Sequence, residues 1–154
     1  MPRFSPATFR HVVRASAIYD LVVTAPFATP WTFAWNWRQL SALDVRLGGT
    51  ALPPFEVYAT LVACLMGSIV LAWSALRIAT PERRLGRHDG GARFLFSTWM
   101  AWALAITHQP LLWLFLLPEF AWGIVQWWPV AEPSHGLRQP SWIPAPSPTP
   151  TTPG

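Results

Sequence analysis

Long apolar runs separated by short polar segments dominate the pattern of this chain, and their lengths suit a lipid environment. A helix needs about 20 mainly apolar residues to cross the ~30 Å hydrocarbon core of a bilayer. Four segments approach that requirement, residues 15–35, 57–76, 94–108 and 111–130. Together they predict an all-α fold, an integral-membrane four-helix bundle formed by residues 15–131.

The first apolar segment, residues 15–35, is the least regular of the four. It contains Asp20, Pro26 and Pro30. Proline removes a backbone donor, so we expect the second half of this helix to be bent or loosened. A cleaved signal peptide is the alternative, because Val23–Ala25 resembles a small-residue cleavage site. The proline that follows this triplet and the aspartate within the apolar run both argue against it.

The remaining segments predict one regular span and one hairpin. Residues 57–76 contain no charged side chain and have the required length without adjustment. Residues 94–108 are short for a span, and Pro110 favours a tight reversal directly into segment 111–130.

The two ends of the chain differ from its apolar centre. Residues 1–14 predict a basic N-terminal arm. Residues 132–154 predict a disordered Pro-rich tail, since residues 139–154 include six prolines and have too little apolar surface to fold. A ligand for a domain that binds polyproline helices is the alternative, but the PxP spacing has low specificity.

Composition supports insertion and predicts an orientation. Only 12% of the 154 residues are charged and 52% are hydrophobic, whereas soluble domains carry roughly 25% charged residues. Nine arginines lie on one side of the predicted spans and two, Arg38 and Arg46, on the other. The cytoplasmic loops of membrane proteins are enriched in arginine and lysine. We therefore expect a bacterial inner (cytoplasmic) membrane protein with both termini cytoplasmic.

The excess of positive charge predicts a lipid partner rather than nucleic acid. The formal charge is +4, and all 11 basic residues are arginine. These arginines flank apolar runs, and no groove-reading motif is present, so we expect no nucleic-acid binding. Anionic headgroups attract juxtamembrane arginine by about 1 kcal/mol each. The expected anionic-lipid contacts come from the segment between the second and third spans, namely Arg77, Arg83, Arg84, Arg87 and Arg93.

Small residues recur every four positions in the second and third spans. Such stripes let helix backbones approach closely, which favours packing in lipid. We therefore predict that these spans pack antiparallel along two stripes, one made of Ala59, Ala63 and Gly67 and the other of Ser97, Ala101 and Ala105.

Two carboxylates inside predicted spans are the sharpest chemical feature. Asp20 and Thr24 share a face of the first span, and Glu119 and Gln126 share a face of the fourth, at depths that correspond. A charged carboxylate at the bilayer centre costs about 2.5 kcal/mol or more, so Glu119 must be protonated, paired or facing water. These four residues predict an intramembrane polar site, either a proton-accessible or ligand-binding site or a set of structural hydrogen bonds.

Other site chemistry finds little support. The four histidines and the single Cys64 make no close metal-ligand pair, so we predict no metal site, no haem and no cofactor. No catalytic or nucleotide-binding motif appears. The Gly86–Gly91 stretch resembles a phosphate-friendly loop, but we favour a solvated turn.

The sequence favours a non-enzymatic role, as an accessory, scaffold or assembly protein in a larger membrane complex. We expect membrane protein partners or a homo-oligomer, because the 11 tryptophans offer lateral contacts. The alternatives are a small proton-coupled transporter or ligand-binding protein that uses the intramembrane carboxylates, and, last, a lipid-modifying enzyme with Glu119 as general acid.

Overall fold

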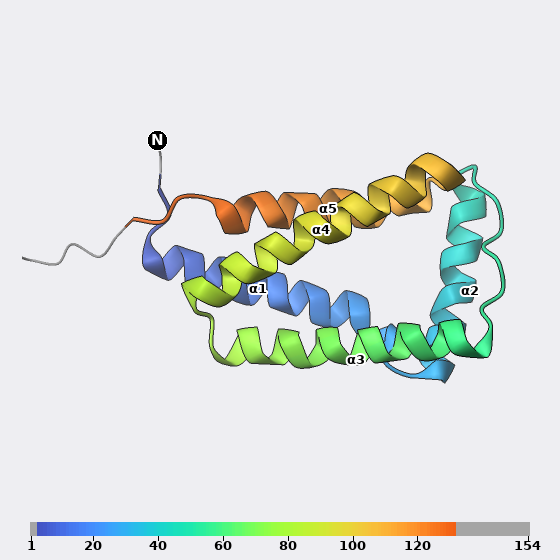
Figure 1. The fold of residues 1–154 in the computed structure, drawn as a ribbon, viewed down its shortest axis with the longest axis horizontal. Coiled ribbons are helices and arrows are strands. Elements are labelled where there is room, and N and C mark those ends of the chain that lie inside the picture. Colours follow the sequence, from blue (N-terminus) through green and yellow to red (C-terminus); the bar gives the residue numbers. More distant parts are fainter. Residues whose placement is uncertain (1–2, 132–154) are drawn as a thin grey trace, which may run out of the picture.

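The computed structural model describes residues 3–131, and this part of the chain is helical, without a β-strand. The predicted tail, residues 132–154, lies outside the described residues. The all-α prediction is confirmed, with one helix more than the four expected. Residues 3–131 form five α-helices and one 3-10 helix, which are α1 (Pro6–Thr24), η1 (Ala25–Phe27), α2 (Pro30–Arg46), α3 (Val57–Ala79), α4 (Arg83–Thr107) and α5 (Leu111–Trp127). Figure 1 shows how the α-helices are arranged.

Local capping signals start the first two helices. Ser5 accepts a hydrogen bond from the Thr8 backbone N–H at 3.0 Å, and Pro6 occupies the first turn of α1. Thr29 and Pro30 repeat this arrangement at the start of α2. A hydroxyl at the N-cap satisfies a free backbone donor, and proline fits the first turn because it has no N–H to leave unpaired. Helix α1 therefore begins at Pro6, inside the predicted basic arm.

The predicted helix over residues 15–35 is wrong as a continuous element. Helix α1 ends at Thr24, η1 follows, and α2 is turned by 100° from α1 and η1. The break lies at Pro26 and Pro30, so the bend that these prolines predict is present, and it is a sharp corner between two helices. Proline cannot donate the hydrogen bonds that would carry α1 forward.

The prediction that residues 83–93 form a loop is also wrong, because α4 begins at Arg83. Gly86 and Gly90 allow this polar helical stretch to pack closely against its neighbours. A Cβ at Gly86 would lie 2.5 Å from Val13, and one at Gly90 would lie 2.7 Å from Trp127. The Gly86–Gly91 stretch is therefore neither a phosphate loop nor a solvated turn.

The hairpin at Pro110 is confirmed. Helix α4 ends at Thr107, His108 takes the left-handed conformation with φ of 55°, and α5 begins at Leu111.

Backbone hydrogen bonds connect the segment after α5 to the segment before α1. The Phe4 N–H donates to the Pro129 carbonyl at 2.9 Å, and the Ala131 N–H donates to the Phe4 carbonyl at 2.8 Å.

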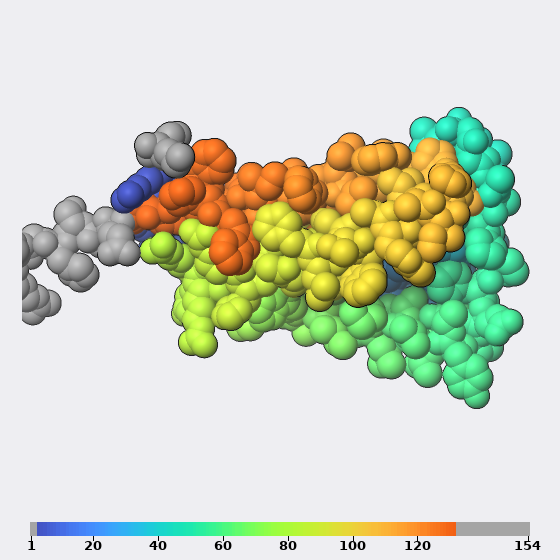
Figure 2. Space-filling view, turned by 45° about the horizontal axis from the view of Figure 1, so that its top comes forward, coloured from blue at the N-terminus to red at the C-terminus, as the bar shows by residue number. Residues whose placement is uncertain are grey.

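The helices form two antiparallel pairs, with α2 across one end. Helix α1 packs mainly against α3, and α4 packs mainly against α5. Figure 2 shows α2 covering this end of the elongated body. The predicted packing of α3 against α4 through their small residues is wrong, because the backbones of these two helices do not approach each other closely. The two helices are linked through longer side chains, Trp73 and Arg77 of α3 and Asp89 of α4. The small residues of α3 and α4 lie against other parts of the structure. Gly67 lies against the Phe27 backbone of η1, and Ser97 and Ala101 face a hollow shared with α5.

Asp44 ties α2 to the start of α5. Its Oδ1 accepts a hydrogen bond from the Leu111 backbone N–H at 2.9 Å, and the side chain is fully buried. Beside it, Gln109 Oε1 accepts from the Thr50 N–H at 3.1 Å. The loop after α2 is thereby held to the α4–α5 turn.

Asp44→Ala is expected to lower the free energy of unfolding by about 1–2 kcal/mol, because it leaves a buried helix N-terminal N–H unpaired. Asp44→Asn is the matched control. It retains an accepting oxygen and should stay within about 0.5 kcal/mol of the original chain. Denaturant titration of the purified protein measures both. Equal losses in the two variants would show that the cap contributes nothing.

By length and composition, α3 is the one helix of residues 3–131 that could cross a membrane alone. The bent pair of α1 with η1 and α2 passes the same test only when taken together, and α5 is apolar but has 17 residues. The surface is strongly apolar over α3, α4 and α5. Among its most exposed side chains are Val57 at 81%, Leu61 at 52%, Ile69 at 61%, Trp99 at 59% and Trp102 at 61%.

Candidate functional site: an ion cluster beside an apolar cavity

The interior between the two helix pairs is charged. Two arginines and three carboxylates meet there, and we call them the ion cluster. They come from four of the five α-helices: Asp20 of α1, Arg77 of α3, Asp89 and Arg93 of α4, and Glu119 of α5. The cluster thus joins the α1–α3 pair to the α4–α5 pair.

Arg93 is the centre of the ion cluster and is 2% exposed. Each of its three nitrogen atoms donates to a different carboxylate. Nη2 donates to Asp20 Oδ2 at 2.5 Å, Nη1 to Glu119 Oε2 at 2.8 Å, and Nε to Asp89 Oδ2 at 2.9 Å. The fixed fork of a guanidinium suits this role, which a lysine ammonium could not fill with the same geometry.

Arg77 is the second cation and is fully buried. Its Nη2 donates to Asp20 and its Nη1 to Asp89, both at 2.5 Å. Longer contacts of 3.4 Å reach the hydroxyls of Ser16 and Ser74. Asp20 Oδ2 is therefore shared by both arginines.

Asp89 accepts from four side chains. Beyond the two arginines, its Oδ1 accepts from the Trp73 indole N–H at 2.9 Å, and its Oδ2 accepts from Gln126 Nε2 at 2.8 Å. Gln126 also donates to Ser16 Oγ at 2.7 Å. Because buried carboxylates are tolerated only when they are paired, these donors explain why Asp89 remains inside the fold.

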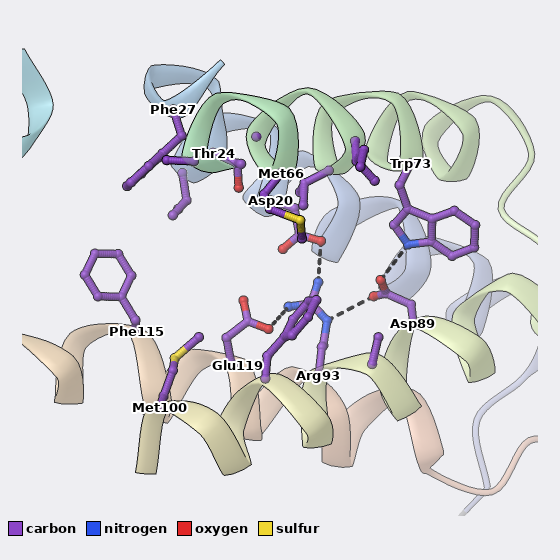
Figure 3. A pocket seen from close by; sticks show the side chains of 17 residues that line it. Asp20, Thr24, Phe27, Met66, Trp73, Asp89, Arg93, Met100, Phe115 and Glu119 are labelled. Atoms are coloured by element: carbon purple, nitrogen blue, oxygen red, sulfur yellow. Dashed lines mark hydrogen bonds and ion pairs between the residues drawn. The ribbon is translucent and has the colours of Figure 1, made fainter. Parts of the chain in front are cut away.

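A cavity of about 500 Å³ lies beside the ion cluster, between α1, α3, α4 and α5. Asp20, Asp89, Arg93 and Glu119 form its charged side, and most of the remaining lining is apolar. Figure 3 shows Arg93 between the three carboxylates, with Met100 and Phe115 on the opposite side of the space. Met66, Ile69 and Phe96 line the cavity and are nevertheless 40–61% exposed. The cavity therefore opens to the surface between α3 and α4.

All four residues of the predicted polar site belong to this region. Asp20 and Glu119 do not touch each other but share Arg93, and Thr24 lines the cavity. Gln126 is fully buried and contacts Asp89 rather than the predicted carboxylates.

Arg77, Asp89 and Arg93 were missed as site residues. The two arginines are expected at lipid headgroups because they flank apolar runs, and Asp89 falls in the Gly86–Gly91 stretch for which we favour a solvated turn. One signal was present, since Asp89 and Arg93 are four residues apart and would share a helix face. Gly86 and Gly90, on a neighbouring stripe, were the other sign of a packed helix.

The structure contradicts the expected lipid contacts of Arg77 and Arg93, whose guanidinium groups are buried in the ion cluster. Arg87 is also engaged, because it donates to the carbonyls of Trp127 at 2.6 Å and Trp128 at 3.0 Å. Burial, with a smaller contribution from Arg83, lowers the pKa of Arg87 from its ordinary value. Arg83 and Arg84 are exposed, so the prediction of lipid contact stands for them untested.

Cofactor and metal ligands do not gather in this site. Within residues 3–131, no three His, Cys, Asp or Glu side chains could hold one metal ion. The three carboxylates of the cluster converge on guanidinium groups instead. Comparison with protein-family models, curated proteins and solved structures finds no match for this chain.

Proposed function

We propose that this chain is a multi-pass membrane protein that binds a small apolar or amphipathic molecule in its cavity, without catalysing a reaction. The first half of the proposal is supported by the inverted distribution of side chains. The charged residues of the ion cluster are inside, whereas tryptophan, leucine and isoleucine cover α3, α4 and α5. In water this arrangement would expose large apolar patches. In a bilayer the apolar side chains would contact lipid, and the charged side chains would be paired inside the protein.

Helix lengths and charges suggest how the chain would sit in a bilayer. The 23 residues of α3 would extend about 34 Å, enough to cross the hydrocarbon core. Helix α2 would lie in the outer interface, since Trp31 and Trp35 are 81% and 57% exposed on one of its faces. Exposed Arg83 and Arg84 at the opposite end favour a cytoplasmic location for both termini.

The ligand-binding half of the proposal is carried by the cavity. Its volume of about 500 Å³ is within the range of small-molecule sites, as is an apolar lining with a few convergent polar groups. The opening between α3 and α4 would face the bilayer, so an apolar ligand would enter from lipid. Each carboxylate of the cluster is ion-paired with an arginine, which favours binding over catalysis.

Cysteine labelling tests the membrane topology. In a Cys64→Ala background, Ala51→Cys lies after α2 and Thr80→Cys lies between α3 and α4, both at exposed positions. We expect a membrane-impermeant maleimide to label Ala51→Cys in intact cells and Thr80→Cys only after permeabilisation. Recovery of the protein in the soluble fraction, or labelling of both positions from one side, would contradict the topology.

A matched pair of substitutions tests the cavity. The neutral fluorophore N-phenyl-1-naphthylamine is added to protein in lipid nanodiscs, and the signal of lipid-only nanodiscs is subtracted. Ala63 lines the cavity and Ala59, one turn earlier, does not. We expect Ala63→Phe to abolish probe binding by filling the cavity and Ala59→Phe to leave it unchanged. Equal behaviour of the two variants would remove the basis for a ligand site.

An accessory role in a larger complex is the second candidate. The specific observation is a row of exposed side chains on α4, namely Trp99, Trp102 and Ile106. Buried interfaces are enriched in tryptophan, so this row suits a helix of another membrane protein. Crosslinking in native membranes should then recover a partner, and recovery of monomer with lipid only would count against this role.

A further inference from the structure

We propose that the cavity binds an amphipathic monocation, a protonated or quaternary amine with an apolar body. This inference rests on the proposed ligand-binding function and adds the charge of the ligand. It follows from the balance of charges in the ion cluster, from the orientation of two carboxylate oxygens and from the aromatic lining of the cavity.

The ion cluster carries more negative than positive charge. Asp20, Asp89 and Glu119 contribute three negative charges, and Arg77 and Arg93 contribute two positive charges, a formal sum of −1. An uncompensated charge is expensive in a site screened from water, so the cluster favours one further positive charge.

Two carboxylate oxygens are available to that charge. Asp20 and Glu119 each use Oδ2 or Oε2 for Arg93, and their second oxygens make no hydrogen bond within the described part of the chain. Both residues line the cavity. Figure 3 shows these second oxygens on the side of Arg93 that faces the cavity. A cationic headgroup placed there would contact both carboxylates.

The cations of the cluster do not offer an equivalent site for an anion. All three nitrogens of Arg93 already donate to carboxylates, and Arg77 is fully buried. An anionic ligand would also approach a cluster that is already negative. The cavity therefore discriminates between ligands of opposite charge.

The apolar lining of the cavity suits the rest of such a ligand. Its lining includes the aromatic rings of Phe27, Phe96 and Phe115, together with Met66 and Met100. Aromatic faces attract organic cations, and apolar side chains accommodate an alkyl or aryl body. Carboxylates and aromatic surface in one cavity are the features an amphipathic amine requires.

Three octyl compounds with different headgroups test the inference by displacement of N-phenyl-1-naphthylamine from the original chain in nanodiscs. Octylamine is cationic at neutral pH, octanol is neutral and octanoate is anionic. We expect octylamine to displace the probe at the lowest concentration and octanoate at the highest, after correction for partitioning into lipid-only nanodiscs. Equal potency of octylamine and octanol would overturn the inference and leave the cavity intact, whereas no probe binding at all would overturn the proposed function as well.

Glu119→Gln supplies the second comparison. It keeps an oxygen for Arg93 and brings the formal charge of the cluster to zero. We expect octylamine to bind about 30-fold more weakly, with octanol unchanged. Glu82→Gln removes the same charge at an exposed position outside the cavity and should change neither. Unchanged octylamine binding in Glu119→Gln, the result expected if a proton neutralises Glu119 in place of a ligand, would overturn the inference. The octyl series on the original chain remains decisive if this variant fails to fold.

Discussion

Arg93→Met is expected to lower the free energy of unfolding by about 3–5 kcal/mol, the cost of removing one partner from a buried ion network. Methionine fills much of the space but leaves Asp20, Asp89 and Glu119 with Arg77 as the one remaining cation of the ion cluster. Glu119 would lose its ion pair, and the three carboxylates would repel one another or take up protons. Denaturant titration in detergent micelles, followed by circular dichroism, measures the loss.

Two further variants distinguish the loss of the buried ion network from the effect of replacing any arginine by methionine. Arg83→Met changes an exposed position of the same helix and should alter stability by less than about 0.5 kcal/mol. Adding Glu119→Gln to Arg93→Met removes one unpaired carboxylate and should restore part of the lost stability, a coupling that a double-mutant cycle reports. Similar stability of the Arg93→Met and Arg83→Met variants would show that the ion cluster does not hold the two helix pairs together.

Gly67→Leu is expected to cost about 3 kcal/mol, the upper part of the range for overpacking. A Cβ at Gly67 would lie 2.8 Å from the Phe27 carbonyl carbon and 2.9 Å from its oxygen. These are backbone atoms at the corner between η1 and α2, so they cannot rotate away as a side chain can. The substitution should therefore separate α3 from η1, and thermal unfolding should show a lower midpoint.

Gly91→Ala is the matched control for this argument. A Cβ at Gly91 meets nothing within 4 Å, and the residue lies inside α4. Alanine there should raise stability by about 0.5–1 kcal/mol, because glycine loses more backbone freedom on folding. A loss of stability in Gly91→Ala, or none in Gly67→Leu, would contradict the packing of these helices.

Local signals in the sequence predicted much of the helical framework. The apolar run after Glu56, the prolines at positions 26 and 30, and Pro110 marked the start of α3, the corner after α1 and the α4–α5 turn. Each depends on backbone chemistry within a few residues, namely a missing donor or a continuous apolar stretch. The position of these elements could therefore be read without knowledge of the fold.

The partners of the helices could not be predicted in this way. Small residues on α3 and α4 indicated that each helix packs closely against a neighbour, but they did not identify that neighbour. Gly67 meets η1, and Ser97 faces α5. The corner at Pro26 and Pro30 decides this outcome, because α2 lies across the end of the bundle and places α3 against α1.

The candidate site, too, was predicted in part from the sequence and decided in part by the tertiary structure. The sequence alone determined that Asp20 and Glu119 are carboxylates within apolar surroundings and must find partners, since burial of an unpaired charge is too costly. Which partners they find was decided only by the tertiary structure. Asp20 and Arg93 are separated by 72 intervening residues and meet at 2.5 Å, because the two helix pairs place them at the same depth. From its neighbours in sequence, Arg93 is indistinguishable from an arginine that flanks a membrane span. Only the arrangement of the four helices around it makes it the centre of the ion cluster.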